Sequence, residues 1–357
     1  MMLRILDALD SGLRQNDVLL LVNQISNNPI ADFMTLNLTV LDDYANIVRT
    51  LPCVNLLGDH SLTVYTDCER NIDTLADRLK FTDALLLLRE RTHITAELIA
   101  RLPRLKMITL NGPYPHVDVE ACTARGIVVC SEHARTSYAT AELTWGLIIA
   151  AMRHIPQQMA RLKAGQWQNR AGTGLRGRTL GIYGYGRIGK QVAGFGKAFG
   201  MRVLVWSREA ARAQALADGY ETAATREALF DEADVLSIHI RLLPETRGMV
   251  TPGDLARMKP TAVFVNTSRA ELVAEGALAA ALRDGRPGCA AVDVYEDEPV
   301  MNADNPLLQL DNVIATPHLG YMERDQMGNY FSDNIKRVLA FAAGKPYGVV
   351  NPAALEV

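Results

Sequence analysis

The sequence of 357 residues predicts an α/β protein with two doubly wound parallel sheets, one domain being inserted into the other. Three observations predict this fold. Apolar runs of strand length alternate with helical patterns, a glycine-rich turn follows one run near the middle of the chain, and one more helical pattern follows the last run. We expect an N-terminal extension of unknown role over 1–36, a first domain formed by 37–137 and 319–357, and a second domain over 138–318.

The first domain begins with a regular alternation from Leu36 onward. Alternating strands and helices indicate a parallel sheet covered on both faces, so we expect a flavodoxin-like arrangement. The expected strands are Leu38–Leu41, Leu62–Tyr65, Ala84–Leu88, Leu105–Leu110 and Ile127–Cys130, and the expected helices are Tyr44–Leu51, Ile72–Leu79, Thr95–Leu102 and Asp118–Arg125.

A long helix is expected between the two domains. Apolar residues recur at helical spacing from Tyr138 to Lys163. At 1.5 Å per residue this stretch would span about 39 Å, which suits a helix that bridges two domains. Pro156 is expected to kink it.

A glycine turn opens the second domain. The apolar run Thr179–Tyr183 leads into Gly184-x-Gly186-x-x-Gly189, after which the apolar spacing becomes helical. In such a turn the first glycine permits a sharp bend, the second lets a pyrophosphate approach the backbone, and the third lets the helix pack on the strand. The free N–H groups and the helix dipole favour phosphate at that end of the helix. The sequence therefore predicts a Rossmann domain that binds a dinucleotide.

The alternation then continues to the end of the second domain. We expect a six-stranded sheet, and a last helix near Met322–Ala342 that returns to cover the first domain. Five further strands are expected: one that begins at Arg202, and then Val235–Ile240, Ala262–Thr267, Ala290–Val294 and Val313–Ala315. Helices are expected near Arg226–Asp231, Pro252–Met258 and Ala274–Asp284.

The composition excludes some classes of binding partner and indicates the cellular compartment. Lys and Arg number 37 against 40 Asp and Glu, a net charge of −3, so no nucleic-acid or anionic-membrane partner is expected. The five cysteines form no C-x-x-C pair, which indicates reduced thiols in a cytoplasmic protein. No apolar stretch approaches the ~20 residues of a membrane span, and no signal peptide is evident. No His/Cys/Asp cluster has metal-ligand spacing, so no metal is expected.

Three chemically active residues follow three successive strands of the second domain. Arg269, Glu298 and His318 come after the apolar runs that end near Val265, Val292 and Ala315. Ligands of open α/β sheets bind beyond the carboxyl ends of the strands. A lone histidine or arginine is more often a surface residue, but three such groups at the mouth of a dinucleotide site indicate an active site.

From about Leu36 to the C-terminus the chain resembles the D-isomer-specific 2-hydroxyacid dehydrogenases, which include D-3-phosphoglycerate, glyoxylate/hydroxypyruvate and D-lactate dehydrogenases. The resemblance implies an oxidoreductase that interconverts a D-2-hydroxy acid and its 2-oxo acid with NAD or NADP. It also implies a homodimer built around the long helix of the second domain. The matching segments are Gly184–Gly189, Asn266-Thr267-Ser268-Arg269, Asp293-Val294-Tyr295-Glu296 with Glu298-Pro299, and Pro317-His318-Leu319-Gly320.

The resemblance assigns catalytic roles that the chemistry explains. Hydride removal from a 2-hydroxy acid requires the hydroxyl proton to leave, and the imidazole of His318 suits that transfer near neutral pH. Glu298 is implied to hold the other ring nitrogen. The planar fork of Arg269 can hold the substrate carboxylate and polarise the C2 oxygen.

Other site residues are implied by the resemblance alone. The turn at Asn111 and Gly112 matches the family loop whose backbone amides bind the substrate carboxylate, although its flanking prolines depart from the usual pattern. For the cofactor, besides Gly184, Gly186 and Gly189, the implied residues are Arg187 and Ile188 at the pyrophosphate, His239 and Ile240 near the adenosine, Thr267 and Ser268 by the nicotinamide ribose, Asp293 at the carboxamide, and Gly320.

Cofactor choice depends on the end of the second strand of the Rossmann domain. NAD-selective sites place an acid there, about 20 residues beyond the glycine turn. Here Ser207 and Arg208 occupy this place and could bind a 2′-phosphate, whereas Glu209 could instead turn inward to the ribose. We expect NADP(H) to be accepted at least as well as NAD(H).

A rival hypothesis is a nucleotide-sensing binding protein, like the transcriptional corepressors that share this fold and keep similar residues. Turnover of 2-oxo acids distinguishes the two. The sequence does not identify which 2-hydroxy acid is the substrate.

Overall fold

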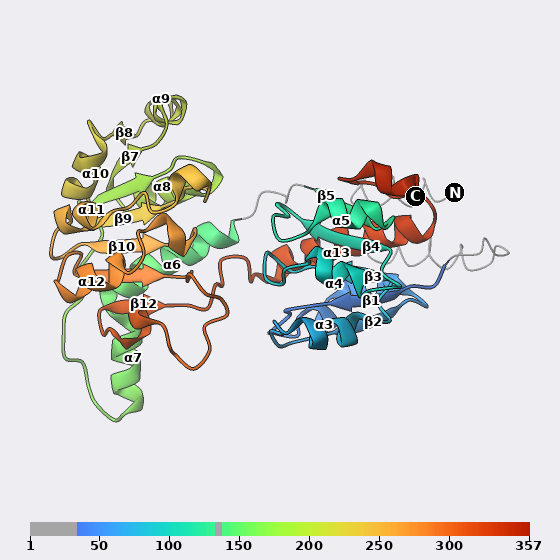
Figure 1. Ribbon diagram of the computed structural model, residues 1–357. Coiled ribbons are helices and arrows are strands. Elements are labelled where there is room, and N and C mark those ends of the chain that lie inside the picture. Colours follow the sequence, from blue (N-terminus) through green and yellow to red (C-terminus); the bar gives the residue numbers. More distant parts are fainter. Residues whose placement is uncertain (1–33, 133–137) are drawn as a thin grey trace.

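The computed structural model describes residues 34–132 and 138–357, which form two α/β domains (Figure 1). One contains a five-stranded sheet and the other a seven-stranded sheet. All pairs of named strands are parallel in both. The predicted fold class is therefore confirmed. The extension expected over 1–36 lies outside the described residues except for 34–36.

The five-stranded sheet has the order β2-β1-β3-β4-β5, which is the flavodoxin-like order. Its central strands are almost wholly buried because helices cover both faces. Two separate clusters of buried side chains, one around Leu38 and Leu86 and one around Leu85 and Ile108, mark these faces. The five predicted strands are all present: β1 Asn37–Val40, β2 Ser61–Val64, β3 Ala84–Leu86, β4 Met107–Asn111 and β5 Val128–Glu132.

Three of the four helices expected in this domain are present: α3 Ile72–Leu79, α4 Ala96–Ala100 and α5 Val119–Ala124. The helix expected over Tyr44–Leu51 is wrong, because 3₁₀ turns over Val48–Thr50 and Pro52–Leu57 replace it. The Asp43 carboxylate accepts hydrogen bonds from two backbone N–H groups in this region, and Asn46 has a φ of 50°. Local side-chain bonding thus overrides the helical spacing.

The seven-stranded sheet has the order β12-β11-β10-β9-β6-β7-β8. The chain reverses its direction of winding between β6 and β9, which creates the crevice where such sheets bind dinucleotides. Six strands were expected; the seventh, β8, has only two residues and pairs with β7 alone. The strands are β6 Thr179–Tyr183, β7 Arg202–Trp206, β8 Glu221–Thr222, β9 Val235–Ile238, β10 Val263–Asn266, β11 Cys289–Val292 and β12 Val313–Ala315.

Helices cover both faces of this sheet as well. One buried cluster includes Phe230 and Phe264, and another includes Ile148, Leu180 and Val192. The helices are α8 Arg187–Ala198, α9 Glu209–Ala217, α10 Arg226–Glu232, α11 Pro252–Arg257 and α12 Ala277–Arg283, and further 3₁₀ turns occupy Pro244–Thr246, Ala270–Leu272 and Pro306–Gln309. A last 3₁₀ turn, Pro352–Leu355, lies in the first domain against α5 and β5.

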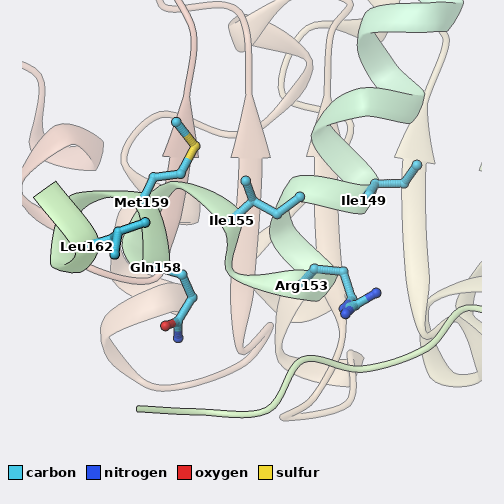
Figure 2. Close-up of a pocket in the computed structure, with 6 residues that line it drawn as sticks. All are labelled: Ile149, Arg153, Ile155, Gln158, Met159 and Leu162. Carbon is cyan, nitrogen blue, oxygen red and sulfur yellow. The ribbon is translucent and has the colours of Figure 1, made fainter. Parts of the chain in front are cut away.

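The single long helix expected over Tyr138–Lys163 is wrong. Two helices, α6 Ala139–Arg153 and α7 Ile155–Lys163, meet at His154, which has a left-handed φ of 53°. Pro156 lacks an N–H and its ring would clash with the carbonyl four residues earlier, so the helix breaks there rather than kinking. Helix α6 is largely buried, whereas α7 contains no buried residue and exposes Met159 and Leu162 (Figure 2).

The last helix, α13 Arg324–Ala342, covers the first domain as predicted (Figure 1). Its residues Met327, Phe331 and Ile335 belong to the same buried cluster as Leu38 of the first sheet. The second domain is thus inserted between the fifth strand and the last helix of the first. None of the described helices is long and apolar enough to cross a membrane.

Candidate active site

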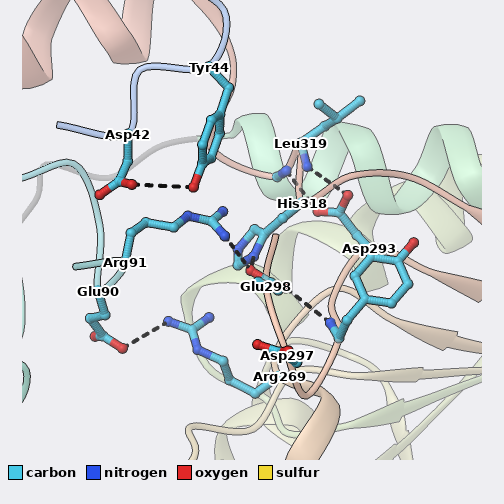
Figure 3. Close-up of polar contacts among 12 residues, drawn as sticks. Asp42, Tyr44, Glu90, Arg91, Arg269, Asp293, Asp297, Glu298, His318 and Leu319 are labelled. Atoms are coloured by element: carbon cyan, nitrogen blue, oxygen red, sulfur yellow. Dashed lines mark hydrogen bonds and ion pairs between the residues drawn. The ribbon is translucent and has the colours of Figure 1, made fainter. Parts of the chain in front are cut away.

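A cleft of about 520 Å³ lies between the two domains. Its lining residues follow the carboxyl ends of strands β2 and β3 in one sheet and of β10, β11 and β12 in the other. Arg269, Glu298 and His318 are among them, so the structure brings together the three residues that the sequence singled out (Figure 3).

His318 and Glu298 form a close pair in this cleft. Nδ1 of His318 is 2.6 Å from Oε2 of Glu298, with 13% and 17% of the two side chains exposed. His318 follows β12 in a left-handed conformation with a φ of 52°, and its ring packs edge-on against Tyr321. The carboxylate therefore fixes which ring nitrogen carries a proton toward Glu298 and leaves Nε2 for proton transfer.

Glu298 is held by two further groups. The N–H of Tyr295 donates to Oε1 over 3.0 Å, and Nη1 of Arg91 donates to Oε2 over 2.7 Å. Burial would raise the pKa of the Glu298 carboxyl, but the hydrogen bond with His318, the charge of Arg91 and the Tyr295 N–H together lower it. The side chain therefore stays ionised next to the imidazole.

Asp293 anchors the segment that carries His318. Its carboxylate accepts hydrogen bonds from the Thr316 hydroxyl at 2.6 Å, the Leu319 N–H at 2.7 Å and the Gly320 N–H at 2.8 Å. Burial raises the pKa of this carboxyl, and the three donors oppose the rise. The hydroxyl of Thr140 on α6 donates to the Gly320 carbonyl, so the segment is tied down from both sides.

Arg269 follows β10 in a turn closed by its own neighbours. The Asn266 side chain donates to the Arg269 carbonyl and accepts from the Ser268 N–H. The Thr267 hydroxyl bonds to that of Thr144 on α6. Nη1 of Arg269 donates to the Ser268 carbonyl over 2.8 Å, and the guanidinium remains 34% exposed toward the cleft.

The glycine turn has the geometry that a pyrophosphate site needs. Gly184 has a φ of 102°, and a Cβ there would lie 2.5 Å from the carbonyl oxygen of His239. A Cβ on Gly189 would lie 2.1 Å from the Gly184 oxygen, whereas one on Gly186 would meet open space. Gly186 also begins α8 without any side-chain cap. The turn thus packs tightly on the protein side and leaves space and helix N–H groups on the other.

Comparisons with known proteins agree with this geometry. Residues 145–320 match the family model described as D-isomer specific 2-hydroxyacid dehydrogenase, NAD binding domain. The glyoxylate reductase of Aeropyrum pernix is 38% identical over 297 residues, which cover 80% of this chain and 88% of that one. The chain belongs to the D-isomer-specific 2-hydroxyacid dehydrogenases.

Other members of this oxidoreductase family differ in length. The D-3-phosphoglycerate dehydrogenase of Methanocaldococcus jannaschii is 39% identical over 273 residues, 75% of this chain, which spans about half (52%) of that enzyme. Among solved structures, the phosphoglycerate oxidoreductase of Vibrio cholerae is 46% identical with a TM-score of 0.83, covering 87% of this chain and 100% of that one. The D-lactate dehydrogenase of Aquifex aeolicus, complexed with NAD and lactic acid, is 26% identical with a TM-score of 0.68, covering 88% and 99%.

The remaining residues predicted to bind the cofactor follow strands β7 and β9 of the seven-stranded sheet. His239 is partly buried after β9, where its Nε2 is 2.9 Å from the Ser237 hydroxyl and desolvation lowers its pKa to about 3. Ile240 follows it and is partly buried. Ser207, just beyond β7, accepts a hydrogen bond from the Tyr185 N–H over 3.3 Å. Arg208 is exposed at the start of α9.

The structure does not bring Asn111 and Gly112 into the cleft lining. Strand β5 extends to Glu132 and pairs with Asn111, and the Gly112 N–H donates to the Glu132 carbonyl over 2.8 Å. The Asn111 side chain is bonded to Arg337. The Gly112 amide is therefore already engaged within the sheet, and the binding of a substrate carboxylate by this turn stays a prediction.

The loop after β3 lines the cleft instead, and the sequence reasoning missed it. The cleft is lined by Arg89, Glu90 and Arg91. Across it, Arg91 approaches Glu298 and Glu90 approaches Arg269 (Figure 3). Arg70, after β2, bonds to Asp297. A signal was present, because three charged residues follow directly on an apolar run, the same pattern that identified Arg269.

Proposed function

We propose that this family member interconverts a D-2-hydroxy acid and its 2-oxo acid by hydride transfer with a nicotinamide dinucleotide. The observation that carries the proposal is the 2.6 Å pair of His318 Nδ1 and Glu298 Oε2 in a cleft that also holds the Arg269 guanidinium. The bound nicotinamide would supply the hydride chemistry.

The protein groups have separate roles in this proposal. In the reducing direction His318 gives the proton on Nε2 to the C2 oxygen, and in the oxidising direction it takes that proton back. Glu298 holds Nδ1 and stabilises the imidazolium. Arg269 binds the substrate carboxylate and polarises the C2 oxygen through its planar fork.

The dinucleotide would be held along the crevice of the seven-stranded sheet. Helix N–H groups at Arg187 and Ile188, next to Gly186, suit the pyrophosphate. We assign His239 and Ile240 to the adenosine side, and Thr267, Ser268 and Gly320 to the nicotinamide side. Asp293 accepts three hydrogen bonds within the protein, which leaves one of its roughly four acceptor positions for a carboxamide N–H.

We propose that NADP(H) is accepted at least as well as NAD(H). The place of the acid found in NAD-selective sites is taken by Ser207 and Arg208, and Arg208 is exposed at the start of α9, where its guanidinium suits a 2′-phosphate. Removing it in Arg208→Ala should weaken NADP(H) selectively by about 1.5–3 kcal/mol. Measured kcat/KM values for both coenzymes test this, and a hundredfold preference of the wild type for NADH would contradict it.

We also propose a homodimer formed through α6 and α7. An open hollow on this surface is lined by apolar side chains of Ile149, Ile155, Met159 and Leu162 (Figure 2). Met159 and Leu162 are three residues apart and lie on the same face of α7, where they are 53% and 60% exposed. Such an exposed apolar stripe marks a protein–protein contact. Sedimentation of the wild type should show a dimer, and the double variant Met159→Glu with Leu162→Glu should be a monomer. A monomeric wild type would contradict the proposal.

The domain division that supports these roles is 37–137 with 319–357 for the substrate and 138–318 for the cofactor. The five free cysteines support a cytoplasmic location.

Turnover with a panel of 2-oxo acids tests the main proposal. Glyoxylate, hydroxypyruvate and larger 2-oxo acids are offered with NADH and with NADPH, and loss of absorbance by the reduced cofactor is followed. His318→Ala is the control that retains the fold without the proton donor. A wild type that binds the cofactor but reduces none of these acids would contradict the proposal and favour a nucleotide-sensing protein.

A further inference from the structure

Glu90 faces the substrate-binding arginine across the cleft (Figure 3). Its Oε2 is 3.8 Å from Nη2 of Arg269, and 33% and 34% of the two side chains are exposed. This separation is that of an ion pair without a hydrogen bond, and such partly exposed pairs are weak. Glu90 is therefore a carboxylate that an incoming anion can displace from the guanidinium.

A substrate carboxylate needs the same guanidinium. Nη1 of Arg269 already donates to the Ser268 carbonyl over 2.8 Å, and Nη2 is the nitrogen that faces Glu90. Two carboxylates close to one cation repel each other. Glu90 and the carboxylate of a 2-oxo acid therefore compete for Arg269.

Arg89 gives Glu90 a second possible partner. Its guanidinium lies 5.0 Å from the centre of the Tyr321 ring, and no carboxylate in 34–132 or 138–357 is within ion-pair distance of it. Arg89 and Glu90 are consecutive in the chain, and both line the cleft together with Arg269. Glu90 can thus exchange one cation for a neighbouring one.

The remaining arginines of the cleft each have a carboxylate partner. The lining contains six carboxylates and four arginines. Arg91 is paired with Glu298, and Arg70 with Asp297. With a substrate carboxylate on Arg269 and Glu90 on Arg89, all four arginines have a carboxylate partner.

We propose that Glu90 is a specificity-determining residue that makes this cleft select 2-oxo acids with a single negative charge. The carboxylate of the substrate displaces Glu90 from Arg269. Glu90 then neutralises the charge of Arg89 and repels a second anionic group of the substrate, such as a distal carboxylate or phosphate. This inference rests on the proposed function, which places the 2-oxo acid on Arg269.

Two ligands with the same five-carbon chain test the proposal: 2-oxopentanoate, which ends in a methyl group, and 2-oxoglutarate, which ends in a carboxylate. Calorimetry measures the binding of each in the presence of oxidised cofactor, which cannot reduce them. Steady-state kinetics with reduced cofactor then separate KM from kcat. The variants are Glu90→Gln, the conservative Glu90→Asp, and the control Glu271→Gln, which neutralises another carboxylate of the cleft lining.

The wild type should bind 2-oxopentanoate at least tenfold more tightly than 2-oxoglutarate. Glu90→Gln should improve the binding of 2-oxopentanoate about two- to fivefold, the range of a partly exposed ion pair, and that of 2-oxoglutarate about tenfold. KM should fall accordingly, while Glu90→Asp and Glu271→Gln retain the wild-type preference.

Three outcomes would overturn the role of Glu90 and leave the proposed function standing. They are an unchanged preference in Glu90→Gln, weaker binding of 2-oxopentanoate to this variant, and an equal change in Glu271→Gln. If the wild type neither binds nor reduces either acid, the proposed function fails and this inference fails with it.

Discussion

The two sides of the cleft are built differently. On the side of the seven-stranded sheet, His318 and Glu298 are largely buried and joined at 2.6 Å, and Asp293 fixes the segment that carries the histidine. On the other side, Arg91 is buried against Glu298, but Arg70 is 59% exposed and Glu90 is 3.8 Å from its partner. Buried hydrogen-bonded groups keep one geometry, whereas exposed ion pairs rearrange at little cost. The first side is therefore suited to proton transfer, and the second to recognition of the substrate.

The largest effect should come from the buried side. His318→Ala should lower kcat about 10²- to 10⁴-fold, because general acid–base transfer contributes that much, and cofactor affinity should hardly change. His93→Ala, which removes a histidine from the opposite lining, is the matched control and should retain activity. A His318→Ala variant with more than a third of the wild-type kcat would contradict the assignment.

Arg269→Lys tests the point where the two sides meet. The substitution keeps the charge but loses the planar fork, so kcat/KM for 2-oxo acids should fall roughly 10- to 100-fold while thermal melting is unchanged. Arg70→Lys provides the comparison, because Arg70 pairs with the exposed Asp297. Equal kcat/KM in wild type and Arg269→Lys would place Arg269 outside the substrate site.

Glu298 and Arg91 should shift the pH profile in opposite directions. Reduction needs the protonated imidazole, and the carboxylate stabilises that proton, so the alkaline limb should move to lower pH in Glu298→Gln. Arg91 donates to the same oxygen and weakens that stabilisation. Arg91→Met should therefore move the limb to higher pH. The profile of kcat/KM against pH measures both, and shifts in the same direction would refute the shared contact.

The smallest effect on activity is expected at His116, which lies outside the cleft lining. It is buried, and burial lowers its pKa to about 4. The unfolded chain then binds a proton that the folded chain does not, so stability should fall as the pH drops below about 6.5 toward 4. His116→Phe should reduce this loss between pH 7 and 5 by about 1–2 kcal/mol without altering kcat. Urea midpoints at the two pH values provide the measurement, and equal pH dependence in both proteins would contradict it.

The sequence predicts those parts of the molecule that one local pattern determines. Buried strands such as β3 and β11 are continuous apolar runs, and Gly184 and Gly189 are needed for close backbone contacts that no other residue allows. Arg269, Glu298 and His318 could be found because each lies within six residues of the end of a strand.

Other features depend on contacts that the sequence does not show. The two-residue strand β8 exists only because β7 offers it an edge. Asn111 belongs to a strand rather than a binding turn because β5 pairs with it. The approach of Arg91 to Glu298 joins residues more than 200 positions apart, on different domains. Pairing between distant segments, rather than local propensity, decides each of these cases.

The clamp formed by Asp293 has a mechanical consequence. His318 stands where the chain leaves the seven-stranded sheet for the first domain, a place where it could follow either body. The Asp293 carboxylate accepts hydrogen bonds from Thr316, Leu319 and Gly320. At this crossing between the domains, any rotation of one domain against the other must therefore change the backbone beyond Gly320. The imidazole therefore travels with the sheet that holds the glycine turn, while Arg91 and Glu90 travel with the other body. Closing the cleft then changes the distance of these two charges from Arg269 and Glu298 and leaves the alignment of His318 with its own sheet intact.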